Sequence, residues 1–239
     1  MANTEKASLL FDIDNTLVDR DAAFLRYLQD FMDRNQNAFA NEDVASARDH
    51  ILALDCHGRK DRSQFCQELL QNYPGLPYTA DTLWADHLTL PEFVQADSLL
   101  ENMLERLSSQ YQLMIISNGS ASMQHRKLDS AGLSHFFEHI FISAEIGYEK
   151  PDRRLFSHAL GFCRHTAIVM IGDDYLNDMQ PAMALQLKTV FVNPGKVQVQ
   201  VQVQVQVQVQ VLELPTWPTR PDREITSIHA LEEALTCLI

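Results

Sequence analysis

The pattern of apolar residues along the chain predicts a buried parallel sheet. Five short runs of mostly apolar residues occur, and polar residues or glycine follow them. Near-continuous apolar runs of this length are typical of parallel strands that are covered on both faces. The predicted strands are residues 8–11, 113–116, 139–142, 167–171 and 189–192.

Helical patterns alternate with the later runs. One helix is predicted from the spacing of Leu99, Leu100, Met103, Leu104 and Leu107. Others are predicted around residues 156–160 and from about residue 228 onward, where Ser227 is a suitable N-cap. Alternating strands and helices indicate an α/β protein with a doubly wound, Rossmann-like parallel sheet.

The region from residue 19 to residue 91 breaks this alternation. It contains several amphipathic helical patterns and no convincing strand. We therefore expect a small all-helical domain at 19–91, inserted directly after the first strand. The α/β core would then comprise residues 1–18 and 92–239.

Residues 197–211 form a perfect alternation of Val and Gln. Period two with β-branched residues is typical of a strand, but this run would extend roughly 50 Å, well beyond the usual strand length. Such low complexity indicates either expansion of a short coding repeat or an error in determining the sequence. We treat the run as an insertion in the C-terminal part of the core and assign it no catalytic role.

Charge and composition limit the partners of the protein. The formal net charge of -13 argues against nucleic acid, because binding to a phosphate backbone needs a basic surface. The four cysteines are scattered, without a Cys-x-x-Cys pair, which suits reduced thiols. The first eight residues lack the apolar centre of a signal peptide, and no apolar stretch reaches the ~18 residues of a membrane span. We therefore expect a cytoplasmic protein that does not enter a membrane.

The most informative polar residues are Asp12 and Asp14, at the end of the first predicted strand. In an extended chain the two side chains would point the same way. Paired carboxylates at the carboxyl end of a parallel strand indicate a cation or catalysis, because ligands bind at that edge. Taken alone, the pair is also compatible with a simple Asx-turn.

Three later segments supply matching groups. Taken alone, each segment also has a purely structural explanation. The segment after the second strand could be a simple strand-to-helix turn, the lysine after the third strand could be a solvated charge, and the aspartates after the fourth strand could lie at a helix N-terminus, which favours aspartate. Three carboxylates within six residues repel one another unless a metal ion or a lysine neutralises them. The groups are Ser117 and Asn118 after the second strand, Lys150 after the third, and Asp173, Asp174 and Asp178 after the fourth.

Together and in this order, these motifs resemble the haloacid dehalogenase-like (HAD) hydrolase superfamily. Asp12-x-Asp14-x-Thr16 resembles its first motif, Ser117 its second, Lys150 its third, and Gly172-Asp173-Asp174 with Asp178 its fourth. The resemblance covers residues 8 to 193, and the helical insertion lies where phosphatases with a helical cap carry that cap. The chain departs from the family at Asn15, where many members have glycine, which should alter the turn slightly.

The resemblance implies a Mg²⁺-dependent phosphomonoester hydrolase that works through an aspartyl-phosphate. Asp12 would be the nucleophile and Asp14 the general acid and base. Thr16, Ser117, Asn118 and Lys150 would bind the phosphoryl group. Mg²⁺ would be held by the Asp12 carboxylate, the Asp14 main-chain carbonyl and Asp173. Asp174 and Asp178 would act through a bound water or by positioning Lys150.

Other functions remain as alternatives. A receiver-like signalling domain would place its acidic pair near the N-terminus and its phospho-acceptor later. It would also be about half this length and would lack the helical insertion. A relative that only binds a phospho-ligand would need a defect that the sequence does not show. A 2-haloacid dehalogenase attacks carbon and carries a different residue at the position of Asp14.

The substrate is expected to be a small phosphorylated metabolite whose identity the sequence does not give; the oligomeric state is likewise left open. Basic residues of the helical insertion could contact the leaving group, although most are expected to form solvated helix faces. The turn at residues 55–59 lies between two predicted helices, from where a loop could reach the active site. The basic residues are Arg48, His57, Arg59, Lys60 and Arg62.

Overall fold

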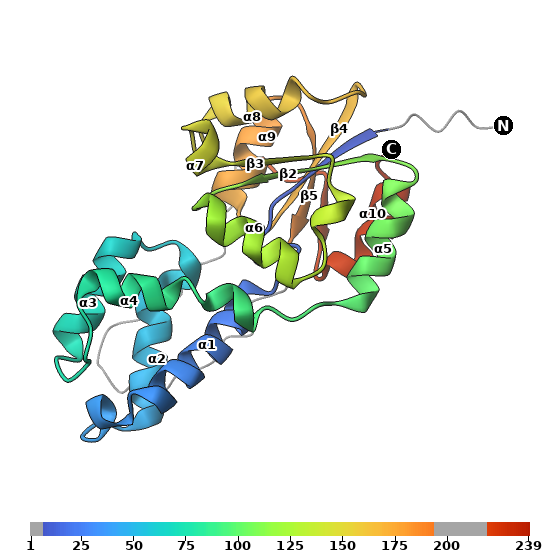
Figure 1. The fold of residues 1–239 in the computed structure, drawn as a ribbon. Coiled ribbons are helices and arrows are strands. Elements are labelled where there is room, and N and C mark those ends of the chain that lie inside the picture. Colours follow the sequence, from blue (N-terminus) through green and yellow to red (C-terminus); the bar gives the residue numbers. More distant parts are fainter. Residues whose placement is uncertain (1–6, 194–218) are drawn as a thin grey trace.

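A computed structural model describes residues 7–193 and 219–239 of the chain. The Val/Gln run predicted as an insertion at 197–211 lies outside these residues. The described chain forms a six-stranded parallel sheet with the strand order β3-β2-β1-β4-β5-β6 (Figure 1). The strands are β1 (Ala7–Phe11), β2 (Gln112–Ser117), β3 (His139–Ile142), β4 (Ala167–Gly172), β5 (Lys188–Val192) and β6 (Arg223–Ile225).

Helices cover both faces of the sheet, as the sequence predicts for a doubly wound fold. Their α-helical bounds follow in chain order, and short 3₁₀ segments and one π-helical turn lie between some of them. The helices are α1 (Arg20–Arg34), α2 (Val44–Asp55), α3 (Arg62–Asn72), α4 (Ala80–His87), α5 (Ser98–Ser108), α6 (Ala121–Ser130), α7 (Ser143–Ile146), α8 (Arg153–Leu160), α9 (Gln180–Ala184) and α10 (Leu231–Thr236). None of the described helices is long and apolar enough to cross a membrane.

The central strand β1 shows how the two faces are packed. All five of its residues are buried, which explains why its sequence is apolar rather than alternating. Leu9 and Phe11 join the core on the face covered by α5 and α10, and Leu10 packs into the opposite core with α8 and α9. Figure 1 shows these two helical layers on either side of the strands.

The five strands predicted from apolar runs are all present, but β6 was not predicted. It has only three residues, of which only Ile225 is buried, and it pairs with β5 at the edge of the sheet. A strand this short and exposed leaves almost no hydrophobic signal in the sequence. The last predicted helix also differs in detail, since a 3₁₀ turn (Ile228–Ala230) capped by Ser227 precedes α10.

In the region where the sequence predicts a helical insertion, the chain forms four α-helices, α1 to α4, which lie as a lobe beside the sheet (Figure 1). Each of these helices begins at a side chain that accepts a hydrogen bond from the first turn. These capping residues are Asp19, Asp43, Asp61 and Thr79. The buried face of the lobe is rich in aromatic rings, including Phe24, Tyr27 and Phe65.

A buried histidine lies among these rings. His87, at the end of α4, is 3% exposed and packs against Phe24, Tyr27, Phe65 and Trp84. Its Nδ1 has no hydrogen-bond partner among the described residues. Burial, together with the charges of nearby arginines, lowers the pKa of His87 to about 3. The side chain is therefore neutral at physiological pH.

This neutral histidine makes the stability of the protein sensitive to acid. Its pKa is lower in the folded chain than the ~6.5 of an unfolded chain, so protonation favours unfolding. Between about pH 6.5 and pH 3, the free energy of unfolding should fall by about 1.4 kcal/mol per pH unit through this group. Urea unfolding at pH 7.5 and pH 5 should show that His87→Phe loses about 2 kcal/mol less than the native protein. His135→Phe, the same substitution at an exposed position, is the control. An equal pH effect in native and His87→Phe proteins would contradict the lowered pKa of His87.

Candidate active site

The carboxyl edge of the sheet gathers the residues that the motifs singled out. Asp12 directly follows β1, Ser117 ends β2, and Asp173 directly follows β4. Since β1 pairs with both β2 and β4 in parallel, these three strands end side by side. Lys150 reaches the same edge from the turn between α7 and α8.

Lys150 forms the centre of this cluster. Its side chain is 3% exposed, and its Nζ lies 2.6 Å from Oδ1 of Asp12 and 2.7 Å from Oδ1 of Asp178. Burial alone would lower the pKa of Lys150, but the two carboxylates outweigh burial and raise it. The Ser117 hydroxyl donates a further hydrogen bond of 3.2 Å to Oδ1 of Asp12. One oxygen of Asp12 is thus held by a cation and a hydroxyl.

Three carboxylates share this small volume. Asp12, Asp173 and Asp178 each offer an oxygen, and the three oxygens lie within 4.8 Å of one another. Burial raises the pKa of Asp173, and the charges of Asp12 and Asp178 raise it further. Burial is also the main reason why the pKa of Asp178 is raised. Lys150 therefore does not balance the negative charge here, and a set of carboxylate oxygens fits a hard divalent cation such as Mg²⁺.

Gly172 makes room for one of these carboxylates. A Cβ atom at this position would lie 2.3 Å from Oδ2 of Asp178, which is fully buried. Asp178 also accepts a hydrogen bond of 3.1 Å from the main-chain N–H of Asp174. The glycine of the fourth motif is thus required by the close approach of Asp178, which in turn holds Lys150.

Asp14 lies at the same edge as Asp12 but has different partners. Its two carboxylate oxygens lie 2.6 and 2.8 Å from Nζ of Lys127, and Gln124 donates a hydrogen bond of 3.1 Å to one of them. Burial would raise the pKa of Asp14, but the charge and hydrogen bonds of Lys127 outweigh it and lower the pKa. Lys127 and Gln124, both on α6, were not predicted from the sequence. Their only signal is that these polar residues share the buried face of the helix with Met123 and Leu128.

The turn after β1 brings Thr16 to the site. The Thr16 hydroxyl is buried and has no hydrogen-bond partner among the described residues, so it is available to a ligand. Asn15 takes a left-handed conformation with φ 57°, which asparagine tolerates better than most residues. Its Oδ1 accepts a hydrogen bond of 3.1 Å from the N–H of Asp21. Asn15, which stands where many family members have glycine, thus takes a positive φ in this chain.

Asn118 holds the loop of Lys150. Its Nδ2 donates to the main-chain oxygen of Lys150 over 2.9 Å, and its Oδ1 accepts from the main-chain N–H of Lys150 over 2.7 Å. Both ends of the amide are thus engaged. A phosphate contact by Asn118, which the resemblance implies, would therefore come from its main chain.

Asp174 stands apart from the three clustered carboxylates. Its side chain caps the π-helical turn (Tyr175–Met179) by accepting from the N–H groups of Leu176 and Asn177. Its other oxygen lies 3.0 Å from Nε of Arg59, which belongs to the helical lobe. Arg59 also lies 4.0 Å from Asp173. The turn at 55–59 therefore does reach the carboxyl edge of the sheet, through Arg59.

The other four basic residues named as candidates for leaving-group contacts pair with acidic neighbours inside the lobe. The sequence predicts solvated helix faces for most of them. The ion pairs that they form contribute little to stability where both side chains are exposed. The pairs are Arg48–Asp49, His57–Asp21, Lys60–Glu68 and Arg62–Asp55.

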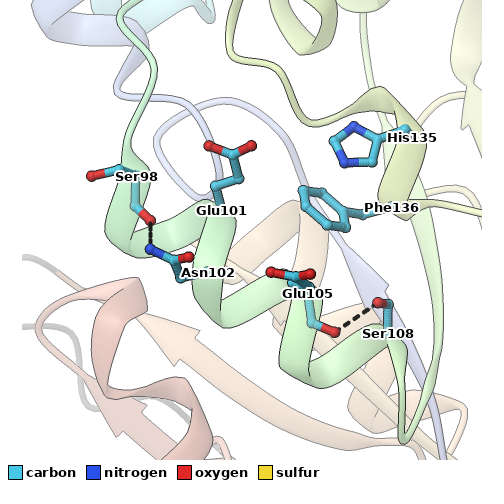
Figure 2. Close-up of a pocket in the computed structure, with 7 residues that line it drawn as sticks. All are labelled: Ser98, Glu101, Asn102, Glu105, Ser108, His135 and Phe136. Carbon is cyan, nitrogen blue, oxygen red and sulfur yellow. Dashed lines mark hydrogen bonds between the residues drawn. The ribbon is translucent and has the colours of Figure 1, made fainter.

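One hollow in the surface lies away from the carboxylate cluster. It has a volume of about 580 Å³ and lies along α5 beside the 3₁₀ turn at Ser134–Phe136 (Figure 2). Glu101 and Glu105 line it, and its lining contains neither lysine nor arginine. Nothing in this lining favours a phosphate, so the carboxyl edge of the sheet is the better candidate for catalysis.

The sequence of the chain is similar to those of known hydrolases. A model of the haloacid dehalogenase-like hydrolase family matches residues 9–192. The chain is 25% identical to the HAD-hydrolase YfnB of Bacillus subtilis over 247 residues, covering 96% of this chain and 98% of that protein. It is 30% identical to a phosphoserine phosphatase of Thermus thermophilus over 141 residues, covering 56% of this chain and 55% of that protein.

Solved structures show the same fold. The crystal structure of YfnB bound to magnesium has a TM-score of 0.70 at 21% identity, covering 97% of this chain and 99% of that one. An L-2-haloacid dehalogenase of Xanthobacter autotrophicus has a TM-score of 0.68 at 15% identity, covering 98% and 99%. At these identities the likeness concerns the fold and does not separate phosphatase from dehalogenase.

The contact between Gly172 and Asp178 can be tested by a double-mutant cycle. Gly172→Ala should lower the free energy of unfolding by about 2 kcal/mol or more, because the new methyl group meets a buried carboxylate. In an Asp178→Ala background the same substitution should cost less than about 0.5 kcal/mol. The free energy of unfolding of all four proteins is measured by urea denaturation. An equal cost in both backgrounds would show that Asp178 is not the reason for this glycine.

Proposed function

Because the chain belongs to the haloacid dehalogenase-like hydrolase family, we propose that it hydrolyses phosphomonoesters of small metabolites through an aspartyl-phosphate on Asp12. One observation carries this proposal. Asp12 is a buried carboxylate held by Lys150 and Ser117, with Asp14 two residues further along the same turn. The proposed nucleophile, acid and phosphate-binding cation thus lie together at the carboxyl edge of the sheet.

Mg²⁺ is the proposed cofactor. Asp12 and Asp173 would hold it with their carboxylates, and the main-chain carbonyl of Asp14 is the third ligand that the family resemblance implies. Asp178 is a weaker candidate, because it already accepts from Lys150 and from the N–H of Asp174. When bound, the ion would neutralise negative charge on the phosphoryl oxygens.

In the first chemical step, an oxygen of Asp12 attacks phosphorus and forms the new P–O bond. The bond between phosphorus and the leaving oxygen breaks. Asp14, which is an anion in its ion pair with Lys127 and takes up a proton before this step, donates that proton to the leaving oxygen. Lys150, Ser117 and Thr16 surround the transferred group with one ammonium and two hydroxyls. They stabilise the negative charge that the phosphoryl oxygens carry through the transition state.

In the second step, Asp14 accepts a proton from water, and the water oxygen attacks phosphorus. The P–O bond to Asp12 breaks, which releases inorganic phosphate and leaves Asp12 as a carboxylate and Asp14 in its protonated form. Lys150 stabilises the restored carboxylate of Asp12 through the contact that it makes at 2.6 Å. The nucleophile therefore starts and ends each turnover as an anion paired with lysine.

The helical lobe, residues 19–91, is proposed to act as a cap over this edge. Arg59 supports this role, because it crosses from the lobe to Asp174. A cap of this kind would exclude water during the first step and contact the leaving group. The proposed substrates are accordingly small phosphorylated molecules, the class on which the phosphoserine phosphatase relative acts by its name.

Hydrolysis of p-nitrophenyl phosphate tests the proposal. The native protein should release p-nitrophenol with Mg²⁺ and lose this activity in EDTA. Asp12→Asn, which keeps the shape of the side chain but removes the nucleophile, should lower kcat by about 10³-fold or more. A panel of small phosphometabolites and acetyl phosphate extends the assay to substrates that a cap would admit.

Two results would contradict the proposal. A folded protein that hydrolyses none of these esters would instead be a phospho-ligand binding relative. Halide release from 2-haloacids without Mg²⁺ would identify a dehalogenase, a reaction for which Asp14 has no role as an acid.

A further inference from the structure

Lys127 has no place in the steps above, although it is among the most deeply buried charges of the chain. Its side chain is 6% exposed, whereas that of Asp14 is 31% exposed. Nζ of Lys127 lies 2.6 and 2.8 Å from the two oxygens of Asp14 and 2.8 Å from Oε1 of Gln124. An ammonium group has three N–H donors, so these three oxygens saturate it. Lys127 has no donor left for a phosphate or a leaving group.

Gln124 fixes the position of this lysine. Because an ammonium group can only donate, Oε1 of Gln124 must be the atom that faces Lys127, and the amide nitrogen faces away. That nitrogen lies 2.8 Å from Oγ of Ser117 and 3.0 Å from the main-chain oxygen of Asn118. Gln124 is 1% exposed, so the amide has little freedom to turn.

A continuous set of hydrogen bonds therefore joins the two catalytic carboxylates. It runs from Asp14 through Lys127 and Gln124 to Ser117, whose hydroxyl donates to Asp12. Gln124 and Lys127 lie three residues apart on α6, so both project from one side of the helix. Since α6 begins just after β2, the strand that ends at Ser117, the helix places both side chains over the site.

We propose that Lys127 is a positioning residue, which fixes the carboxyl group of Asp14 for proton transfer with the leaving oxygen. A carboxyl group held only at its Cβ can rotate, and misplacement by about 1 Å costs about 10²-fold in rate. Lys127 holds both oxygens at once, which removes that rotation. Its own protons do not move: Asp14, protonated before the first step, gives this proton to the leaving oxygen and later takes one from water.

This inference rests on the proposed phosphatase function and predicts a dependence on the leaving group. A leaving oxygen that is a weak base departs without protonation, whereas a strongly basic one needs the acid. Loss of Lys127 should therefore harm esters of weakly acidic phenols more than esters of strongly acidic phenols. A residue that only supported the fold, or only bound phosphate, would affect both kinds of ester equally.

The experiment compares kcat/KM for phenyl, p-nitrophenyl and 2,4-dinitrophenyl phosphate, in native protein and Lys127→Met, with Mg²⁺. This ratio reports the steps through departure of the phenol, so later hydrolysis of the aspartyl-phosphate does not obscure it. The loss caused by Lys127→Met should be about 10- to 100-fold greater for phenyl than for 2,4-dinitrophenyl phosphate. Lys188→Met, the same substitution at an exposed position, should leave the native leaving-group dependence unchanged.

Should Lys127→Met fail to fold, Gln124→Leu tests the same point, since it removes the anchor of the lysine but keeps the charge. It should steepen the leaving-group dependence in the same direction. An equal loss for all three esters in the variant would overturn the role of Lys127 while leaving the phosphatase function intact. Absence of turnover in the native protein would overturn both.

Discussion

The charge balance around Lys150 is the constraint on which the rest of the site depends. Burying an ammonium group costs several kcal/mol unless anions surround it, and Asp12 and Asp178 do so at 2.6 and 2.7 Å. Asp173 then adds a third carboxylate that the lysine cannot neutralise, and its pKa is raised accordingly. The cluster is compact because Gly172 lacks a side chain. A divalent cation would complete its charge balance.

Around this cluster the fold divides catalysis between two networks. Lys150 holds the nucleophile and Asn118 holds the loop of Lys150, whereas Lys127 and Gln124 hold the proposed acid. Ser117 belongs to both networks, because it donates to Asp12 and accepts from Gln124. Parallel strands make this arrangement possible, since β1, β2 and β4 all end at a common edge. The helical lobe adds Arg59 from the other side.

The sequence predicts the five main strands, the helical insertion and the order of the motifs, because each depends on local patterns. No local pattern indicates the contacts of Lys127 and Gln124. In the sequence both are ordinary polar residues of an amphipathic helix, and only the packing of α6 shows that they are buried. The contact between Asn118 and Lys150 could not be predicted either, since the two residues are distant in sequence and the side chain of Asn118 bonds the main chain of Lys150. β6 escaped prediction because it is an edge strand of three residues. The catalytic roles of the site residues depend on the proposed phosphatase function.

The central claim is that the carboxylates at the end of β1 and β4 form a divalent-cation site. Calorimetric titration of the native protein with Mg²⁺, without substrate, tests it most directly. We predict one bound ion, with an affinity that falls about tenfold or more in Asp173→Asn and is unchanged in Glu105→Gln, which lies in the acidic hollow along α5. Absence of Mg²⁺ binding, or equal affinity in native and Asp173→Asn proteins, would contradict the account.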